Sequence, residues 1–424
     1  MSWDVVKFGD LYAIPSRNGL MRPSRERGNG FKMINMGELF AYPRIMNPEM
    51  ERVQVSDNEL QKYTVLDGDL LFARQSLVLE GAGKCSIVTT SEHPTVFESH
   101  LIRVRLNKEL CDPYFYFYFF NSQWGLGFIQ QIVNQVAAAG IRGSDLERMK
   151  IIHPPLPAQQ KIAAILSAYD DLIENNNKRI ALLEKAAEEI YREWFVRMRF
   201  PGWEKVKFVK GVPEGWGVKK IGDLVSTQYG YTTSAISEPI GPKFLRITDI
   251  APSIINWDEV PHCSIEDSLQ DKYFLHEGDV VVARTGATVG YAKRINKLHP
   301  ASIFASYLVR LKPTNIDHSI FLGISVESKN FKDFINMFIT GAAQPQANAT
   351  IMSLFPLLLP TSDLIKEFNN LVEPILDSKE QFILKNSKLK QSRDLLLSRL
   401  VSGKLSVEGL DIRFPMGMEG GAES

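Results

Sequence analysis

The chain has 424 residues, of which 44% are hydrophobic and 23% are charged, and its formal net charge is zero. This composition is typical of a globular protein of two or three domains, and it excludes a disordered chain and a strongly basic nucleic-acid binder. No apolar stretch is long enough to span a membrane, and the N-terminus lacks the pattern of a signal peptide. Three isolated cysteines argue against a disulfide framework, so we expect a cytoplasmic protein.

The first block, residues 1–157, contains short β-rich runs separated by Gly, Pro and Asn, which predicts a twisted, mainly antiparallel sheet. "DGDLLFAR" from Asp67 and "SHLIRVRL" from Ser99 are predicted strands, and the aromatic run after Asp112 is a predicted helix. An early Gly-containing loop carries Arg17, Arg22, Arg25, Arg27 and Lys32. Such a loop can neutralise phosphates and read bases, and an ordinary solvated loop is the alternative.

Residues 158–200 form a predicted long helix, because Gly and Pro are absent between 158 and 199 and apolar residues recur at alternating steps of four and three. At 1.5 Å per residue the helix would be roughly 60 Å long. Asn176 occupies one position of this apolar seam, where it either fixes the register of a helix pair or simply faces solvent. The seam comprises Ile162, Leu166, Tyr169, Ile173, Asn176, Ile180, Leu183, Ala187, Ile190 and Trp194.

The second block, residues 201–360, repeats the first. "WGVKKIGDL" from Trp216 matches "WDVVKFGDL" from Trp3, "EGDVVVAR" from Glu277 matches "DGDLLFAR", and "SYLVRLK" from Ser306 matches "SHLIRVRL". The chain is therefore interpreted as a tandem duplication. The loop that corresponds to the Arg-rich loop is different in character here, since Tyr229, Tyr231, Thr232 and Thr233 dominate it. A protein with two distinct targets would need such a difference.

Residues 361–405 form a second predicted long helix that ends at Gly403, and residues 406–424 are expected to be disordered. Each helix outruns its own block, so we expect the two to pair as an antiparallel coiled coil with one block at each end, related by a pseudo-twofold axis. An ordinary amphipathic helix packed on its own block is the alternative. The predicted fold is α+β, with two α/β domains separated by two long antiparallel helices.

No catalytic motif emerges from the sequence, and His262 beside Cys263 is interpreted as a loop dipeptide and not as a metal site. Polar clusters are the better candidates for function, because Arg, Gln and Lys at strand ends and loops can contact base edges and phosphates. Salt bridges and helix caps are the structural alternatives for these side chains. The candidate DNA-binding residues are Arg17, Arg22, Arg25, Arg27, Lys32, Arg74, Gln75, Lys84, Arg142, Tyr229, Tyr231, Thr232, Thr233, Lys243, Arg246, Arg284, Thr285, Lys293, Arg294, Gln344 and Gln346.

The layout resembles the specificity subunit of a type I restriction–modification enzyme. The resemblance rests on "GDLVSTQYGYTTSA" from Gly222, "EGDVVVARTGATVG" from Glu277, "TGAAQPQANAT" from Thr340 and the stretch "PPLPAQQKIAAILSAYDDLIENNN" from Pro154. It covers nearly the whole chain, and the doubled order of the motifs is its specific feature. The first half departs from the pattern after Arg74, where "QSLVLEGAGK" replaces the Gly-containing "TGATVG".

The resemblance implies two target recognition domains that each read one half of a split DNA sequence, with the helices setting the spacer. It also implies docking of two modification subunits, which bind S-adenosylmethionine and methylate adenine, and of restriction subunits, which use ATP and Mg. This chain would then hold no cofactor or metal and catalyse no reaction, and its dissimilar loops predict a non-palindromic target. The alternatives are the specificity subunit of a type IIB/IIG-like system and a non-catalytic two-lobed scaffold.

Overall fold

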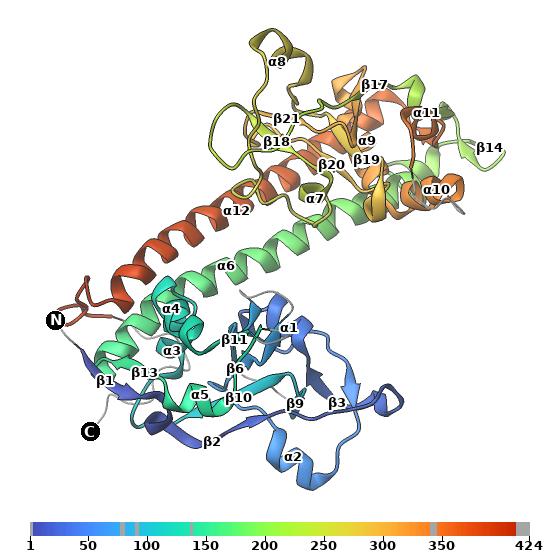
Figure 1. Ribbon diagram of the computed structural model, residues 1–424. Helices are drawn as coiled ribbons and strands as arrows, with labels where there is room; N and C mark the ends of the chain where they lie inside the picture. Colours follow the sequence, from blue (N-terminus) through green and yellow to red (C-terminus); the bar gives the residue numbers. More distant parts are fainter. Residues whose placement is uncertain (1–2, 77–80, 90–92, 136–138, 340–345, 413–424) are drawn as a thin grey trace. The chain divides into compact units, whose positions relative to one another are not determined.

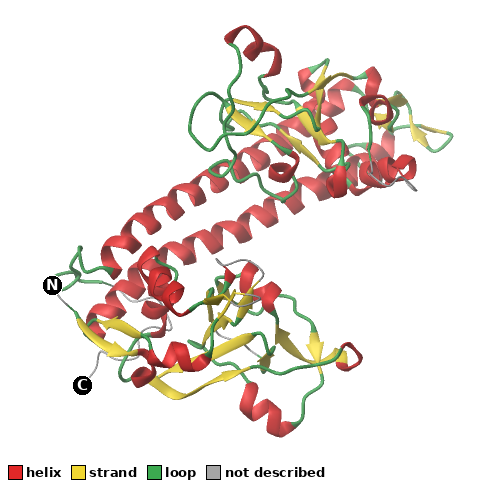
Figure 2. Ribbon diagram, viewed as in Figure 1, coloured by secondary structure: helices red, strands yellow, loops and turns green. Residues whose placement is uncertain are grey.

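The computed structural model describes residues 3–76, 81–89, 93–135, 139–339 and 346–412 (Figure 1). It divides into two compact units, each of which combines sheet and helix (Figure 2). Unit 1 comprises Met1–Ile173 and Leu389–Ser424, and unit 2 comprises Glu174–Lys388. The predicted α+β class with long helices is confirmed. Among the described residues, no helix is both long and apolar enough to cross a bilayer.

Unit 1 is built on a five-stranded sheet with the strand order β2-β10-β6-β8-β4. β10 pairs antiparallel with both β2 and β6, β6 pairs antiparallel with β8, and β4 joins parallel to β8. The strands are β1 Asp4–Lys7, β2 Tyr12–Asn18, β3 Arg27–Ile34, β4 Arg44–Ile45, β5 Arg52–Val53, β6 Leu70–Ala73, β7 Gln75–Ser76, β8 Cys85–Val88, β9 Thr95–Phe97, β10 Leu101–Leu106, β11 Asn134–Gln135, β12 Ala139–Gly140 and β13 Lys150–His153. The helices are η1 Phe8–Leu11, η2 Ser24–Glu26, α1 Met36–Ala41, α2 Asp57–Tyr63, α3 Pro113–Phe120, α4 Gln123–Ile132 and α5 Gly143–Arg148.

Helix α3 confirms the helix predicted for the aromatic run. Asp112 caps it by accepting hydrogen bonds from the backbone N–H groups of Tyr114 and Phe115, and Pro113 occupies the first turn, where its missing N–H costs nothing. All but one of its eight residues are buried, because α3 lies inside the main apolar cluster of the unit. The Phe120 ring packs 5.0 Å from that of Phe8.

Unit 2 repeats this plan with a four-stranded sheet of order β17-β22-β19-β20, in which β22 is again central and antiparallel to both neighbours. Its strands are β14 Phe208–Val209, β15 Val212–Pro213, β16 Gly217–Lys220, β17 Val225–Tyr229, β18 Lys243–Leu245, β19 Val280–Ala283, β20 Ala292–Arg294, β21 Ser302–Phe304, β22 Leu308–Pro313 and β23 Pro356–Leu359. Its helices are η5 Trp203–Lys205, η6 Ile221–Asp223, α7 Ile247–Ile250, α8 Asp267–Tyr273, η7 Gly286–Thr288, η8 Ile316–His318, α9 Ser319–Glu327, α10 Lys329–Ile339 and α11 Ala349–Ser353.

Two long helices run through the chain, α6 (Leu156–Tyr191, continued by a π-helical turn Arg192–Val196) and α12 (Ser362–Val401). In unit 1, Asp170 of α6 forms an ion pair with Arg393 of α12. In unit 2, Asn176 contacts Asn386 and Glu184 contacts Lys379. Residue numbers therefore increase along α6 while those of the contacting residues decrease along α12. Within unit 2 the two helices are therefore antiparallel, as predicted.

Asn176 lies buried in the helix seam of unit 2, which contradicts the solvent-facing alternative. Its Nδ2 donates to Asn386 Oδ1 at 2.8 Å, and Asn386 Nδ2 donates to Asn177 Oδ1 at 2.9 Å. Asn176 and Asn386 are only 8% and 6% exposed. Because a buried amide needs a partner, this layer favours one alignment of the two helices over others.

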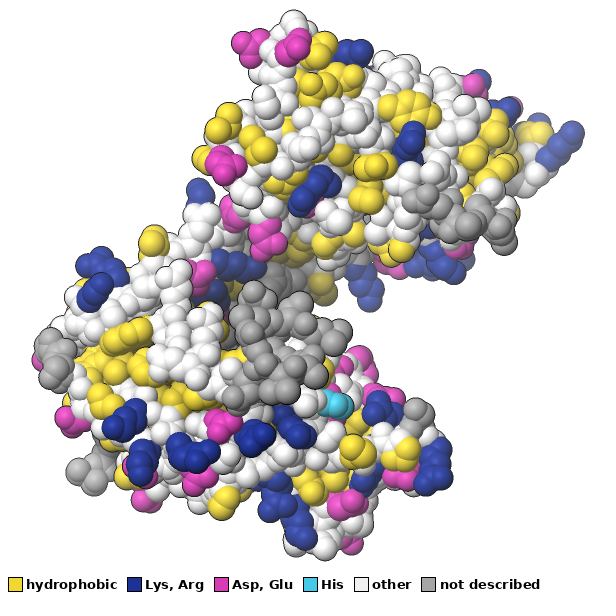
Figure 3. Space-filling model, in the orientation of Figure 1, with side chains coloured by type: hydrophobic (Ala, Val, Ile, Leu, Met, Phe, Trp, Pro, Cys, Tyr) yellow, Lys and Arg dark blue, Asp and Glu magenta, His cyan; other side chains and the backbone are white. Residues whose placement is uncertain are grey.

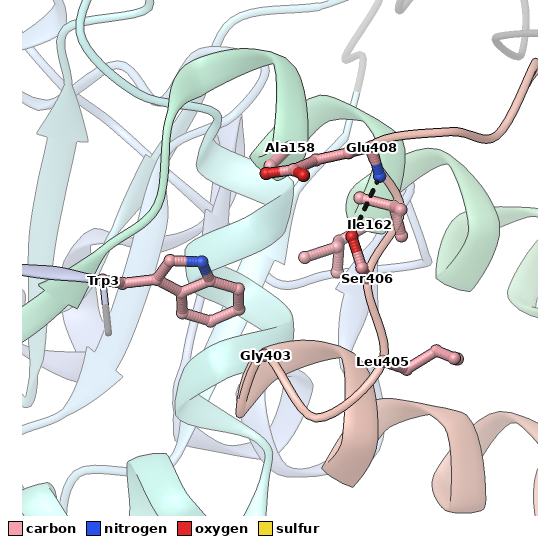
Figure 4. A pocket seen from close by; sticks show the side chains of 8 residues that line it. Trp3, Ala158, Ile162, Gly403, Leu405, Ser406 and Glu408 are labelled. Atoms are coloured by element: carbon pink, nitrogen blue, oxygen red, sulfur yellow. Dashed lines mark hydrogen bonds between the residues drawn. The ribbon is translucent and has the colours of Figure 1, made fainter. Parts of the chain in front are cut away.

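The C-terminal segment packs against unit 1 beyond the end of α12. Gly403 adopts a left-handed conformation (φ +69°) just past the helix, as predicted. Val407 is buried, and Lys161 Nζ donates to the carbonyl oxygens of residues 407, 408 and 410. This segment and Trp3 line a small pocket beside α6 (Figure 4). The expectation of disorder therefore does not hold for residues 406–412, whereas residues 413–424 lie outside the described part of the chain.

A buried arginine occupies the same position in both central strands, Arg103 in β10 and Arg310 in β22, at 2% and 7% exposure. Arg310 Nη1 donates to the Phe274 carbonyl at 2.7 Å and lies 3.5 Å from Asp279 Oδ2. Asp279 is itself only 2% exposed, and burial raises the pKa of its carboxyl group although Arg310 opposes the rise. The arginine thus fixes the turn that precedes β19.

We predict that Arg310→Met lowers the free energy of unfolding of unit 2 by about 3 kcal/mol, because it leaves a buried carboxylate without its partner. Denaturant unfolding, followed by the fluorescence of the tryptophans, measures the change. The matched control is Lys329→Met, whose side chain is 88% exposed and whose loss should change stability by less than about 0.5 kcal/mol. Equal effects of the two variants would contradict the assigned role of Arg310.

Candidate nucleic-acid interface

In unit 1, backbone segments from distant parts of the chain meet where β6 ends. The Arg74 N–H donates to the His100 carbonyl at 2.7 Å, and the Arg74 carbonyl accepts from Ile141 N–H at 2.9 Å. β7 pairs with β12, so that Gln75 lies opposite Gly140. A Cβ on Gly140 would lie 3.2 Å from the Arg74 carbonyl oxygen, so glycine permits this close approach. Arg74 and Gln75 are thereby placed beside Arg142.

Unit 2 repeats this arrangement at the end of β19. The Arg284 N–H donates to the Tyr307 carbonyl at 3.0 Å, and the Arg284 carbonyl accepts from Ala347 N–H at 2.9 Å. Thr285 bridges to Gln346, which is the counterpart of the β7–β12 pairing. Thr285 itself is buried, whereas Gln346 is exposed. The predicted residues Arg284, Thr285 and Gln346 are therefore brought together, and Gln344 lies outside the described residues.

Three residues of these sites were not among the sequence candidates: Asn18, His100 and Tyr307. Tyr307 is 57% exposed and His100 has a 52% exposed side chain, and they occupy the same position of the repeat, directly after a serine. The sequence did offer a signal, because His100 and Tyr307 differ at one position of the otherwise matching motifs "SHLIRV" and "SYLVRL". We define the strand-end cluster of unit 1 as Asn18, Arg74, Gln75, His100 and Arg142, and that of unit 2 as Tyr229, Arg284, Thr285, Tyr307 and Gln346.

Several predicted residues of unit 1 have their side chains engaged inside the protein. Arg22 and Arg27 pair with carboxylates, and the Arg22 hydrogen bond, together with those from Ser56, lowers the pKa of Glu59 to about 2. Lys32 is only 9% exposed. Their donor groups are therefore committed to the fold. The contacts are Arg22 Nη2 to Glu59 Oε1 at 2.6 Å, Arg27 Nη1 to Glu51 Oε2 at 2.8 Å and Lys32 Nζ to Asn47 Oδ1 at 2.8 Å.

The remaining candidate residues of unit 1 are more accessible. The exposed Arg17 guanidinium lies 5.5 Å from the centre of the Tyr63 ring, and the Arg25 side chain is 84% exposed. Lys84 is half-buried and donates to the Phe40 carbonyl at 3.1 Å. None of these three lies in the strand-end cluster, although Arg17 is the strand neighbour of Asn18.

In unit 2, the side chains of three predicted cations, Lys243, Arg246 and Lys293, form bonds within the fold. Arg246 forms a two-bond ion pair with Asp249 within one helical turn. Burial lowers the pKa of both Lys293 and Arg294. By contrast, Thr232 and Thr233 are exposed. The other contacts are Lys243 Nζ to the Val260 carbonyl at 2.7 Å, Lys293 Nζ to the Ser253 carbonyl at 2.6 Å and the Tyr231 ring 5.2 Å from that of Tyr273.

A row of Lys and Arg side chains follows the face of unit 1 that β1, β2 and α5 present (Figure 3). We call Lys7, Arg17, Arg142, Arg148 and Lys150, all of which are exposed, the basic strip. Lys7 and Lys150 face one another across β1 and β13, and α5 packs on both η1 and β2. Arg142 belongs both to the basic strip and to the strand-end cluster of unit 1, so the two surfaces are continuous. Two acidic residues lie on α5 as well: Asp145 pairs with Arg148 at 3.2 Å, and Glu147 lies over Gly9.

Unit 2 has the same backbone at this place but lacks most of the cations. Strand registers and helix starts define the equivalent positions. Only Lys7 is matched by a cation, Lys220. The other four cations are replaced by neutral residues, which shows that the fold does not need them. The pairs are Arg17 with Gln228, Arg142 with Asn348, Arg148 with Leu354 and Lys150 with Pro356.

Comparisons with known proteins found similarity to one class of protein. The family model of the type I restriction modification DNA specificity domain matches residues 1–185. The MjaIX specificity subunit of Methanocaldococcus jannaschii is 23% identical over 96% of this chain and 94% of its own length. The MjaVIII specificity subunit of the same organism is 27% identical over 74% of this chain and 76% of its own length.

Among solved structures, the S subunit of a type I restriction–modification system from M. genitalium shares the fold, with a TM-score of 0.59 and 14% identity. The match covers 94% of this chain and 96% of that one. The resemblance found in the sequence is thus confirmed. The first 185 residues of this chain match the specificity-domain model, and nearly the whole chain is similar to type I restriction enzyme specificity subunits.

Proposed function

We propose that this chain is the non-catalytic DNA-specificity subunit of a type I restriction–modification complex in the cytoplasm. Each block reads one half of a bipartite, non-palindromic target in double-stranded DNA. The observation that carries the proposal is the pair of strand-end clusters. They occupy the same backbone position in both units, yet their side chains differ, with Asn18 and His100 in one and Tyr229 and Tyr307 in the other.

Several polar side chains of the clusters are available for contacts with DNA. Among the described residues, the side chains of Arg74, Gln75, Arg142 and Gln346 have no hydrogen-bond or ion-pair partner. Arg and Gln are the side chains that bind guanine and adenine edges through two hydrogen bonds. Arg22, Arg27 and Lys32, which are engaged inside unit 1, are assigned to the scaffold that positions the cluster.

We assign the role of a spacer to the paired helices. Helix packing over an apolar seam, with the buried Asn176–Asn386 contact, supports a stiff element of fixed length. The helices also dock two modification subunits, which carry S-adenosylmethionine, and through them the restriction subunits, which use ATP and Mg. In this proposal the partner subunits catalyse the reactions, and this chain determines the DNA sequence on which they act.

We predict that methylation sequencing of a host carrying this chain and its modification subunits reveals one bipartite, non-palindromic motif.

Inserting four residues after Asn176, with four more near Asn386 to keep the helices matched, adds roughly 6 Å and should lengthen the spacer by one or two base pairs. A four-residue insertion in the exposed turn between β14 and β15 is the control and should leave the motif unchanged. A palindromic motif, or an unchanged spacer, would contradict the proposal.

We predict that the basic strip contributes phosphate contacts. The triple variant Lys7→Gln/Arg148→Gln/Lys150→Gln should make the negative slope of log affinity against log salt less steep by about two to three, since each lost contact accounts for about 0.9. The motif should stay the same, because phosphate contacts carry no sequence information. Duplex binding at several salt concentrations measures the slope.

The control for the strip is Lys205→Gln/Lys207→Gln/Lys210→Gln, which removes the same charge from exposed positions of unit 2. An equal loss of steepness in both triple variants would show a general charge effect. Loss of the modification subunits on purification with an unaltered slope would show that the strip contacts protein and not DNA.

A further inference from the structure

Arg284 is held differently from its counterpart Arg74. Its guanidinium group lies 5.0 Å from the centre of the Tyr229 ring, within the range of a cation–π contact. Tyr229 is itself fixed, because its hydroxyl oxygen accepts a hydrogen bond from Ala349 N–H at 3.1 Å. In unit 1 the strand register places Asn18 where unit 2 has Tyr229, so Arg74 has no aromatic ring at the equivalent position.

The stacking leaves the hydrogen-bonding edge of Arg284 unused. No carboxylate or carbonyl oxygen among the described residues accepts a bond from its guanidinium group, although the backbone on both sides is fixed by the Tyr307 and Ala347 hydrogen bonds. The side chain is half-buried, beside the exposed rings of Tyr229 and Tyr307. An arginine that serves only the fold would be expected to have an acceptor, as Arg246 has in Asp249.

We infer that Arg284 reads a guanine in the second half of the target, and that Tyr229 orients it for this task. A planar guanidinium group donates two parallel hydrogen bonds to O6 and N7 of guanine, a fixed geometry that the flexible ammonium group of lysine matches less well. Stacking on a fixed ring reduces the number of side-chain conformations that binding must freeze. Arg284 is therefore a specificity-determining residue and Tyr229 a positioning residue. This inference rests on the proposed function.

The test replaces Arg284 by Lys in the full chain, produced together with its modification subunits. Methylation sequencing should show an unchanged first half-site and spacer, and one G·C position of the second half-site that now accepts other base pairs. Binding to duplexes that carry each base pair at that position should show a fall in discrimination by roughly 5- to 150-fold. Arg74→Lys is the matched control and should leave the second half-site unaltered.

Two further variants test the positioning residue. Tyr229→Phe keeps the ring but removes the acceptor of Ala349 N–H, so discrimination at the same position should fall less than in Tyr229→Leu, which also removes the ring. These variants give an answer even if Arg284→Lys fails to fold. Equal discrimination in the wild type and Tyr229→Leu would refute the positioning role.

The outcomes separate this inference from the proposed function. If the wild-type complex produces no bipartite motif, the proposed function fails. If it does, but Arg284→Lys leaves the second half-site fully specified, Arg284 contacts a phosphate or no DNA at all and the inference is wrong. Relaxation at an A·T position in place of a G·C position would equally overturn the assignment to guanine.

Discussion

The structure depends on the antiparallel pairing of one central strand with its neighbour, β6 with β10 in unit 1 and β19 with β22 in unit 2. This pairing buries Arg103 or Arg310, which ties the preceding turn to the sheet. It also brings the residue after the strand, Arg74 or Arg284, to a point where two other segments donate or accept its backbone hydrogen bonds. Because the backbone N–H and carbonyl groups of this residue are hydrogen-bonded within the protein, the side chains around it can vary without loss of the fold.

The duplication acts as an internal comparison of what the fold needs and what it does not. Buried positions keep their chemistry in both copies, as Arg103 and Arg310 do. Exposed positions on the same backbone do not: the basic strip of unit 1 is largely neutral in unit 2, and Asn18 and His100 stand where unit 2 has Tyr229 and Tyr307. Differences between equivalent exposed residues are what a protein with two distinct targets requires.

Electrostatics in this protein is local. The chain carries no net charge, yet Lys and Arg side chains gather along β1, β2 and α5 on the face of unit 1 that Figure 3 shows. Arg22 and Arg27 show why clusters in the sequence are poor guides to such surfaces. Both belong to the Arg-rich segment that was predicted as a loop, although Arg27 begins β3, and Glu59 and Glu51, which neutralise them, come from a different segment and are brought in by folding. The strip, in contrast, combines residues from both ends of the first block.

The sequence by itself determined the duplication, the α+β class, the helix after Asp112 and the two long helices with their seam, because these depend on local periodicity and on matches along the chain. It also marked Arg74, Arg284 and Gln346 as candidates. Only the tertiary structure decided which cations are free to bind a partner, that residues 406–412 pack on unit 1, and that Tyr229 lies under Arg284. Those outcomes depend on contacts between residues far apart in the chain, which no local pattern of residues encodes.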